Sequence, residues 1–254
     1  MWSNRGMKQF YTVRGAKVCA YVEGTGPTIL FIHGTGGNGK TWFNQLRRLS
    51  GQFRAIALDL PGYGESELPP SIESNDDFAA FVSEWMQVAG WDHAVVVGNS
   101  MGGRVCLQLA LDHPERVDGL ILVNASGIQV EGVETLSPGD VSPEEFMQAI
   151  FYRPSPVVVR AGAATSGAWY GTMEKLTAKP LRDMTPHLGE IRVPTLIIWG
   201  DHDRVLPPAF AHAFHQGIPG SRLAMIERSG HVPMMERPGE VNETILEFLN
   251  GMRR

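Results

Sequence analysis

Apolar runs typical of buried β-strands recur along the chain, and helical patterns separate most of them. The runs cover residues 17–23, 28–33, 53–60, 93–99, 117–124, 194–200 and 221–227. Between them, apolar residues recur at spacings of three to four over residues 42–49, 76–89, 101–113, 208–216 and 238–250, which predicts helices with one buried face. This alternation favours an α/β fold in which helices cover both faces of a mostly parallel sheet.

The alternation is interrupted between residues 127 and 192. Three stretches there, 142–152, 155–162 and 167–176, have helical patterns, and none of the segment reads convincingly as a strand. We expect a helical insertion over 127–192, carried by a core of residues 1–126 and 193–254. Because it joins the end of one strand to the next, it should lie above the carboxyl ends of the strands, where open α/β sheets bind ligands.

Composition restricts the classes of function more than it specifies one. The chain has 254 residues, 43% of them apolar and 19% charged, as in an ordinary globular protein with one large core. The formal net charge of −5, without a basic run, argues against a nucleic-acid partner. The sequence has no apolar stretch long enough for a signal peptide or a membrane span, so we expect a cytoplasmic protein. We expect it to act on a small molecule, as a monomer or homodimer.

Cysteine and histidine usage gives no reason to expect a metal or another cofactor. Cys19 and Cys106, the only cysteines, fall in a predicted strand and a predicted helix, where they are expected as small buried residues rather than a disulfide. The sequence has neither a CxxC motif nor a His/Cys cluster with zinc-ligand spacing.

The most informative motif is Gly98-Asn99-Ser100-Met101-Gly102, which lies between a predicted strand and a predicted helix. Small flanking residues permit the sharp, strained turn that lifts a serine side chain clear of the sheet edge. The five letters alone are a weak signal, but the strand, turn and helix around them make Ser100 a candidate nucleophile. The backbone N–H of Met101, at the start of the helix, is then a candidate donor to an oxyanion.

A serine nucleophile needs a histidine base and a carboxylate that orients the histidine. Two loops that follow later strands supply both: Asp201-His202-Asp203 after residues 194–200, and Ser229-Gly230-His231 after residues 221–227. We expect His231 to be the base, because His33 more naturally holds the glycine-rich loop around it and His202 is expected to be exposed. On physical grounds alone, either Asp201 or Asp203 could be the acid.

The glycine-rich stretch from Gly34 to Thr41 has two interpretations. Its letters satisfy G-x-x-x-x-G-K-T, the pattern of a phosphate-binding loop, so a nucleotide-binding protein is an alternative. Only Asp59 follows a strand in the manner of a magnesium ligand, and residues 59–64 fit a tight structural turn better. We therefore favour the interpretation as part of a hydrolytic site.

Five motifs together, HGTGG, DLPGYGES, GNSMGG, WGDHDRVLP and SGHVPMMERP, resemble the α/β-hydrolase superfamily over nearly the whole chain. The resemblance implies that superfamily's eight-stranded, mostly parallel sheet with a helical lid. It also implies that Asp203, three residues after Gly200 and four before Pro207, is the acid, and that Thr35 supplies the second oxyanion N–H. Epoxide hydrolases and haloalkane dehalogenases of this fold have aspartate at the position of Ser100, so both activities are disfavoured.

The residues around these loops predict a largely apolar pocket. The candidate substrate-binding residues are Gly34, Gly36, Trp42, Phe151, Trp169, Val205 and Val232. We expect a serine esterase that works through an acyl-enzyme. The alternatives are a carbon–carbon bond hydrolase of the meta-cleavage type, whose usual tryptophan after the catalytic histidine is missing beside His231, and a ligand-binding receptor on the same fold.

Overall fold

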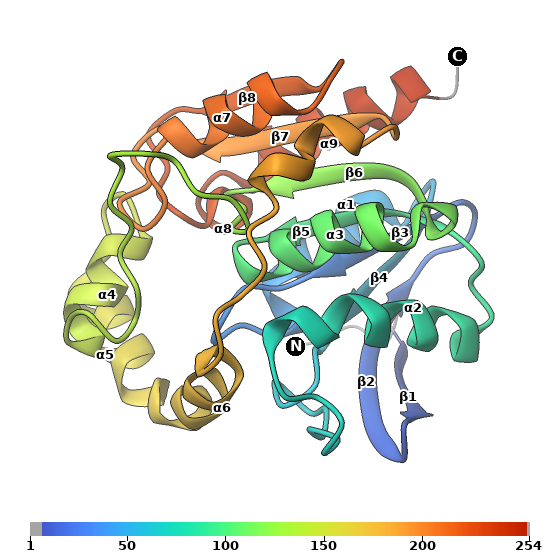
Figure 1. Cartoon of the computed structure of the whole chain (residues 1–254), viewed down its shortest axis with the longest axis horizontal. Coiled ribbons are helices and arrows are strands. Elements are labelled where there is room, and N and C mark those ends of the chain that lie inside the picture. The colour runs from blue at the N-terminus through green and yellow to red at the C-terminus, as the bar shows by residue number, and fades with distance from the viewer. Residues whose placement is uncertain (1–6, 253–254) are drawn as a thin grey trace.

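The sheet has eight strands in the part of the chain described by this computed structural model, residues 7–252 (Figure 1). The strands are β1 (Met7–Val13), β2 (Ala16–Glu23), β3 (Thr28–Ile32), β4 (Arg54–Leu58), β5 (Ala94–Asn99), β6 (Val117–Val123), β7 (Thr195–Gly200) and β8 (Arg222–Ile226). Their order is β1-β2-β4-β3-β5-β6-β7-β8, and only the pairs β1–β2 and β2–β4 are antiparallel. The predicted α/β fold with a mostly parallel eight-stranded sheet is confirmed.

Strand β1 is the one that the apolar runs did not indicate. It forms a hairpin with β2 through Arg14 and Gly15, whose φ angles of 50° and 76° suit the tight two-residue turns that match strand twist. The strand lies at the sheet edge, and Phe10 is exposed there. An edge strand with one solvated face lacks the continuous apolar run of the central strands. The available sequence signals for β1 were the alternation of apolar and polar residues and the Arg-Gly turn.

Helices cover both faces of the sheet. They are α1 (Phe43–Leu49), α2 (Phe78–Ala89), α3 (Met101–Asp112), α7 (Ala209–Gly217), α8 (Pro233–Glu236) and α9 (Pro238–Met252). Successive residues of β5 face opposite ways: Val96 packs in the cluster that includes α2, α3 and α7, whereas Val95 and Val97 pack in the cluster that includes α1 and α9. Burial on both faces explains why the central strands read as unbroken apolar runs.

Residues 127–192 connect β6 to β7 through helices and loops. The helices are α4 (Pro143–Ile150), α5 (Pro156–Thr165) and α6 (Gly167–Thr177), followed by a 3-10 helix at Thr185–Glu190. Ser142 and Ser155 cap the first two, each followed by a proline at the first helical position, where the missing N–H costs nothing. Figure 1 shows α4, α5 and α6 beyond the arrowheads of the parallel strands.

None of the helices within residues 7–252 combines the length and the apolar character needed to cross a membrane. Both cysteines are buried in the core and unpaired.

Candidate active site

The strand order creates a crevice at the carboxyl edge of the sheet. From β3 the chain passes to β4 on one side, and β5 then lies on the other side of β3. The loops that follow β3 and β5 therefore diverge and flank a gap, which is where open α/β sheets bind ligands. Ser100 follows β5 directly, and the loop His33–Gly36 follows β3.

Ser100 stands on a strained turn. Its φ and ψ are 55° and −119°, a backbone conformation that L-residues rarely adopt and that is held only when the surroundings require it. Flanking glycines make the turn possible: a Cβ on Gly98 would lie 2.1 Å from the carbonyl oxygen of Gly102, and one on Gly102 would lie 2.2 Å from that of Ile32. The close approach of β5, α3 and β3 thus requires glycine at both positions.

His231 is buried and bonded to Asp203. Its Nδ1 lies 2.8 Å from Oδ2 of Asp203, and both side chains are almost inaccessible to solvent. Because an ionised carboxylate only accepts hydrogen bonds, Nδ1 carries the proton and Nε2 is left as the basic nitrogen. Ser100 and His231 line the same cavity.

Asp203 accepts three further hydrogen bonds, which fix its orientation. The backbone N–H groups of Val205 and Leu206 donate to Oδ1 at 2.8 and 3.0 Å, and the side-chain amide of Asn124 donates to Oδ2 at 2.7 Å. The sequence analysis did not assign this role to Asn124. A polar residue at the carboxyl end of a buried strand was the available signal.

Asp201 is engaged elsewhere. Its Oδ1 lies 2.6 Å from Nδ1 of His202 and accepts the backbone N–H of Ser229 at 3.2 Å. Partial burial raises the pKa of Asp201, but the hydrogen bonds from His202 and the backbone outweigh burial and lower this pKa overall. The exposed His202 packs its ring edge-on against Tyr152. In this arrangement Asp201 stabilises the loop and does not contact His231.

His33 holds the loop after β3. Its Nδ1 donates to the carbonyl of Gly34 at 2.8 Å and its Nε2 accepts the N–H of Leu60 at 3.0 Å, so both ring nitrogens are occupied. Burial lowers the pKa of His33, which keeps the ring neutral. Within residues 7–252, the backbone N–H groups of Thr35 and Met101 donate no hydrogen bond and remain available to an oxygen at the crevice.

Asp59 belongs to the structural turn. Its buried carboxylate accepts the backbone N–H groups of Gly39 and Glu65 at 2.6 and 2.8 Å. Lys40 is exposed. The described part of the chain contains no group of three or more His, Cys, Asp or Glu side chains arranged to hold a metal ion.

A cavity of about 450 Å³ opens onto Ser100 and His231. Gly34, Val205 and Val232, all expected at the pocket, line it. The opposite wall comes from residues 127–192, through Phe146 and Ile150 of α4 and Met173 of α6 among others. The cavity therefore lies between the strand-end loops and the helical segment.

Four of the expected pocket residues lie elsewhere. Trp42 is 0% exposed and packs on Phe31 within the core cluster of α1 and α9, so its ring belongs to the core and not to the cavity. Phe151 follows the end of α4 and lines a surface hollow instead. Gly36 and Trp169 contact each other: a Cβ on Gly36 would lie 2.6 Å from the Trp169 ring. Neither of these two lines the cavity.

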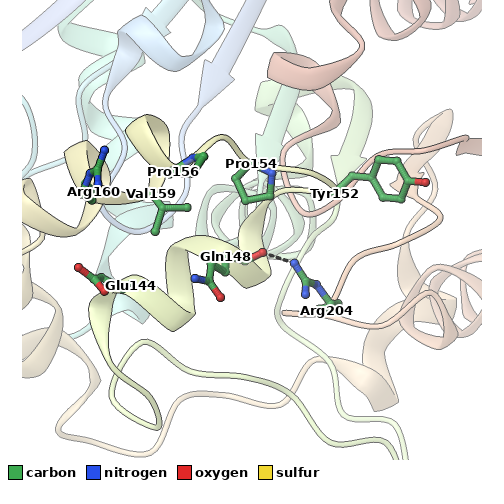
Figure 2. Close-up of a pocket in the computed structure, with 8 residues that line it drawn as sticks. All are labelled: Glu144, Gln148, Tyr152, Pro154, Pro156, Val159, Arg160 and Arg204. Atoms are coloured by element: carbon green, nitrogen blue, oxygen red, sulfur yellow. Dashed lines mark hydrogen bonds between the residues drawn. The ribbon is translucent and has the colours of Figure 1, made fainter.

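The end of α4 is hydrogen-bonded to the loops that carry Asp203 and His231. The backbone N–H of His231 donates to the carbonyl of Ile150 at 2.7 Å, and Glu236 accepts the N–H groups of Tyr152 and Gly230 at 2.8 and 2.7 Å. Arg204 donates to the carbonyl of Gln148, as Figure 2 shows.

The hollow drawn in Figure 2 is a separate surface feature. It measures about 530 Å³ and is lined by residues of α4 and α5 together with Arg204. Neither Ser100 nor His231 borders it, so it is not the reaction cavity.

Among the polar residues of the cavity wall that were not predicted from the sequence, Asn75 and Arg104 stand out. Asn75 and Arg104 both line it and both are buried. Asn75 lies in a 3-10 helix without a recognisable motif, whereas Arg104 had a signal: a charge on the buried side of a largely apolar helix.

Comparison with known proteins agrees with this geometry. A family model described as alpha/beta hydrolase fold matches residues 27–186. The chain is similar to the structure of a membrane phospholipase A described as a bacterial virulence factor (27% identity, TM-score 0.88, 98% of this chain and 87% of that chain). It is also similar to the structure of an esterase from Exiguobacterium antarcticum (27% identity, TM-score 0.84, 96% and 100%).

A third relative has a different named substrate. The 2-hydroxy-6-oxo-6-phenylhexa-2,4-dienoate hydrolase of Comamonas testosteroni is 27% identical over 89% of this chain and 88% of its own length.

Proposed function

This chain belongs to the α/β-hydrolase family, and from that premise we propose that it is a serine hydrolase cleaving a small, largely apolar carboxylic ester. One observation carries the proposal: Ser100, on its strained turn, borders the same cavity as His231, whose Nδ1 is bonded to Asp203. The esterase and phospholipase among the similar structures support ester hydrolysis in general.

The proposed first step forms an acyl-enzyme. Nε2 of His231 takes the proton from Ser100 as its Oγ attacks the ester carbonyl carbon, and the resulting imidazolium is stabilised by Asp203. His231 then donates this proton to the departing alcohol oxygen. In the second step a water molecule, deprotonated by His231, attacks the acyl carbon; the bond to Oγ of Ser100 breaks, His231 returns the proton to this oxygen, and the acid is released.

The developing oxyanion is stabilised by the backbone N–H groups of Thr35 and Met101. Each such donor typically contributes about 3 kcal/mol to the lowering of the barrier. Met101 begins α3, so the helix N-terminus adds a partial positive charge at this point. His33 supports the arrangement by holding the carbonyl of Gly34 next to Thr35. Residues 127–192 act as the lid that excludes water from the cavity.

A carbon–carbon bond hydrolase is the second candidate, and the similarity to the dienoate hydrolase favours it. The residues after His231, Val-Pro-Met-Met-Glu, lack the tryptophan typical of that group. A ligand-binding receptor with slow turnover is a third candidate on the same fold.

The test is hydrolysis of short-chain p-nitrophenyl esters by the wild type and by Ser100→Ala. We expect the variant to lose activity by a factor of about a thousand or more. Equal rates would overturn the serine mechanism. Bleaching of a coloured dienol substrate with little ester turnover would instead identify the carbon–carbon hydrolase, and tight ligand binding with negligible turnover of either would identify the receptor.

A further inference from the structure

Asn75 and Arg104 form a polar patch in the wall of the cavity. Asn75 begins the 3-10 helix Asn75–Asp77 between β4 and α2, and Arg104 lies one helical turn after Ser100 in α3. They are only 5% and 6% exposed, yet both line the cavity along with Ser100 and His231. The patch therefore belongs to the space that a substrate would fill.

The Asn75 amide has no hydrogen-bond partner within residues 7–252. Its Oδ1 is buried and unpaired, and its Nδ2 takes part in no hydrogen bond either. Burying an amide without partners costs roughly 1–3 kcal/mol, and buried polar groups in native proteins are almost always paired. The Nδ2 donor is not among the fully buried atoms, so on a cavity wall a ligand oxygen can accept from it and give the amide a partner.

The surroundings hold Asn75 in place. The N–H groups of Glu73 and Ser74 donate to Asp77 and close the turn around it. The adjacent Asp76 carboxylate accepts the Arg104 guanidinium at 2.6 Å and the N–H of Arg182 at 2.8 Å. A wall fixed in this way needs little reorganisation when it binds a ligand.

With Asp76 included, the polar patch carries no net charge. Asp76 neutralises Arg104 through Nε and one terminal nitrogen, while the other terminal nitrogen, Nη1, has no partner among the described residues. The free donors are thus the Asn75 amide and one guanidinium N–H. They suit an uncharged oxygen acceptor better than a carboxylate, whose charge would lack a counterion here.

We propose that Asn75, assisted by Arg104, determines specificity by binding a carbonyl or hydroxyl oxygen on the part of the substrate remote from the scissile bond. The inference rests on the proposed ester hydrolysis and adds a substrate class to it: oxo- or hydroxy-substituted esters rather than plain alkyl esters.

The experiment compares paired esters. Ethyl esters of straight-chain acids and their oxo and hydroxy analogues, substituted at successive carbons, are assayed with wild type and Asn75→Leu, and acetate esters of the corresponding alcohols cover the leaving-group side. The ratio compared is kcat/KM for the substituted ester divided by kcat/KM for the plain ester. For at least one position we expect this ratio to exceed one in the wild type. Asn75→Leu should reduce it about three- to tenfold, as expected for one lost hydrogen bond.

The matched control is Asn242→Leu. Asn242 in α9 is also buried, at 6% exposure, with an unpaired Oδ1, but it does not line the cavity. Asn242→Leu should give the same ratio of kcat/KM values, substituted ester over plain ester, as the wild type. Asn75→Leu should not lower the melting temperature, because an unpaired amide is replaced by an apolar group of similar size. If it fails to fold, Asn75→Ala provides the same comparison.

The outcomes separate the two proposals. Equal ratios in wild type and Asn75→Leu across the panel, with plain esters hydrolysed, would overturn the inference and leave the proposed function standing. If the wild type hydrolyses none of the esters, the proposed function fails. Calorimetric binding of the same pairs to Ser100→Ala, with and without Asn75→Leu, then decides the inference: an unchanged difference in affinity within each pair would refute it.

Discussion

The two parts of the molecule that enclose the cavity, the strand-end loops and the helical segment 127–192, are built differently. On the sheet side, Asp203, His33 and Asn124 are buried, and their polar atoms are bonded to backbone or to one another. On the helical side, α5 buries only Val159, and its Val157 and Val158 are exposed. The strand-end loops are thus fixed by many buried hydrogen bonds, whereas α5 of the helical segment is mostly exposed.

Under the proposed mechanism, this difference would separate the groups that carry out the reaction from those that select the substrate. Proton transfer requires groups held to within a fraction of an ångström, which a network of buried hydrogen bonds on a rigid sheet provides. Recognition of an apolar chain requires only apolar surface of suitable shape, which tolerates substitution. Changes on the sheet side should therefore have larger effects than equivalent changes in residues 127–192.

The largest effect is expected at Asp203. Asp203→Asn should lower kcat about 10⁴-fold with the fold intact, because an amide no longer stabilises the correct His231 tautomer and its imidazolium. Asp201→Asn, on the same loop, should cost less than about tenfold, since its partners are His202 and Ser229. Steady-state kinetics on both variants tests this, and a greater loss at Asp201 would reverse the assignment.

The next largest effect is a difference in protein stability between alanine substitutions at two glycines, one beside the sheet and one in α6. Gly102→Ala forces a Cβ against the backbone of β3 and should destabilise the protein by about 3 kcal/mol. Gly171→Ala in α6 meets nothing within 4 Å and should stabilise its helix by up to about 1 kcal/mol. Urea unfolding measures both, and equal effects would contradict the distinction between the walls.

A smaller effect concerns pH. Burial lowers the pKa of His33 in the folded state, so below about pH 6.5 the unfolded chain binds a proton that the folded chain does not. Stability should fall as pH falls through this window, by at most about 1.4 kcal/mol per pH unit for one proton. His33→Gln, which keeps a donor and an acceptor, should flatten the curve of unfolding free energy against pH; an identical slope would refute the explanation.

The smallest effect is expected on the helical side. Met173→Ala should raise KM for longer acyl chains about threefold and leave kcat nearly unchanged, because it removes apolar contact that ground and transition states share. Met235→Ala, at a 47% exposed position outside the cavity, is the control. A fall in kcat comparable to that of Asp203→Asn would show that the helical wall takes part in the chemistry.

The same difference explains what the sequence could predict. Ser100, Asp203 and His231 each follow a strand by a few residues, so strand recognition alone places them at one edge of the sheet. Their roles stay predictions until the variants are measured. The loop of Trp42 was also recognisable, but nothing local to it decides which face of the sheet the ring enters, and it enters the core.

The rest of the pocket depends on contacts between distant segments. Asn75 is separated from Ser100 by all of α2 and β5, and only the packed structure brings both to one cavity. Phe151 lies one residue beyond the end of α4, and that single residue decides whether a side chain faces the cavity, as Ile150 does, or the outer hollow. Helix ends are not predictable to one residue from periodicity.

The bonds that join α4 to the loops of Asp203 and His231 restrict how the site can admit a substrate. If residues 127–192 swung away as one body, the hydrogen bonds from His231 to Ile150 and from Tyr152 to Glu236 would break, and the backbone of His231 would lose this support. A motion that keeps these hydrogen bonds leaves α4 in place. The segment 127–192 then cannot open as one rigid body, and α4 belongs mechanically to the strand-end loops.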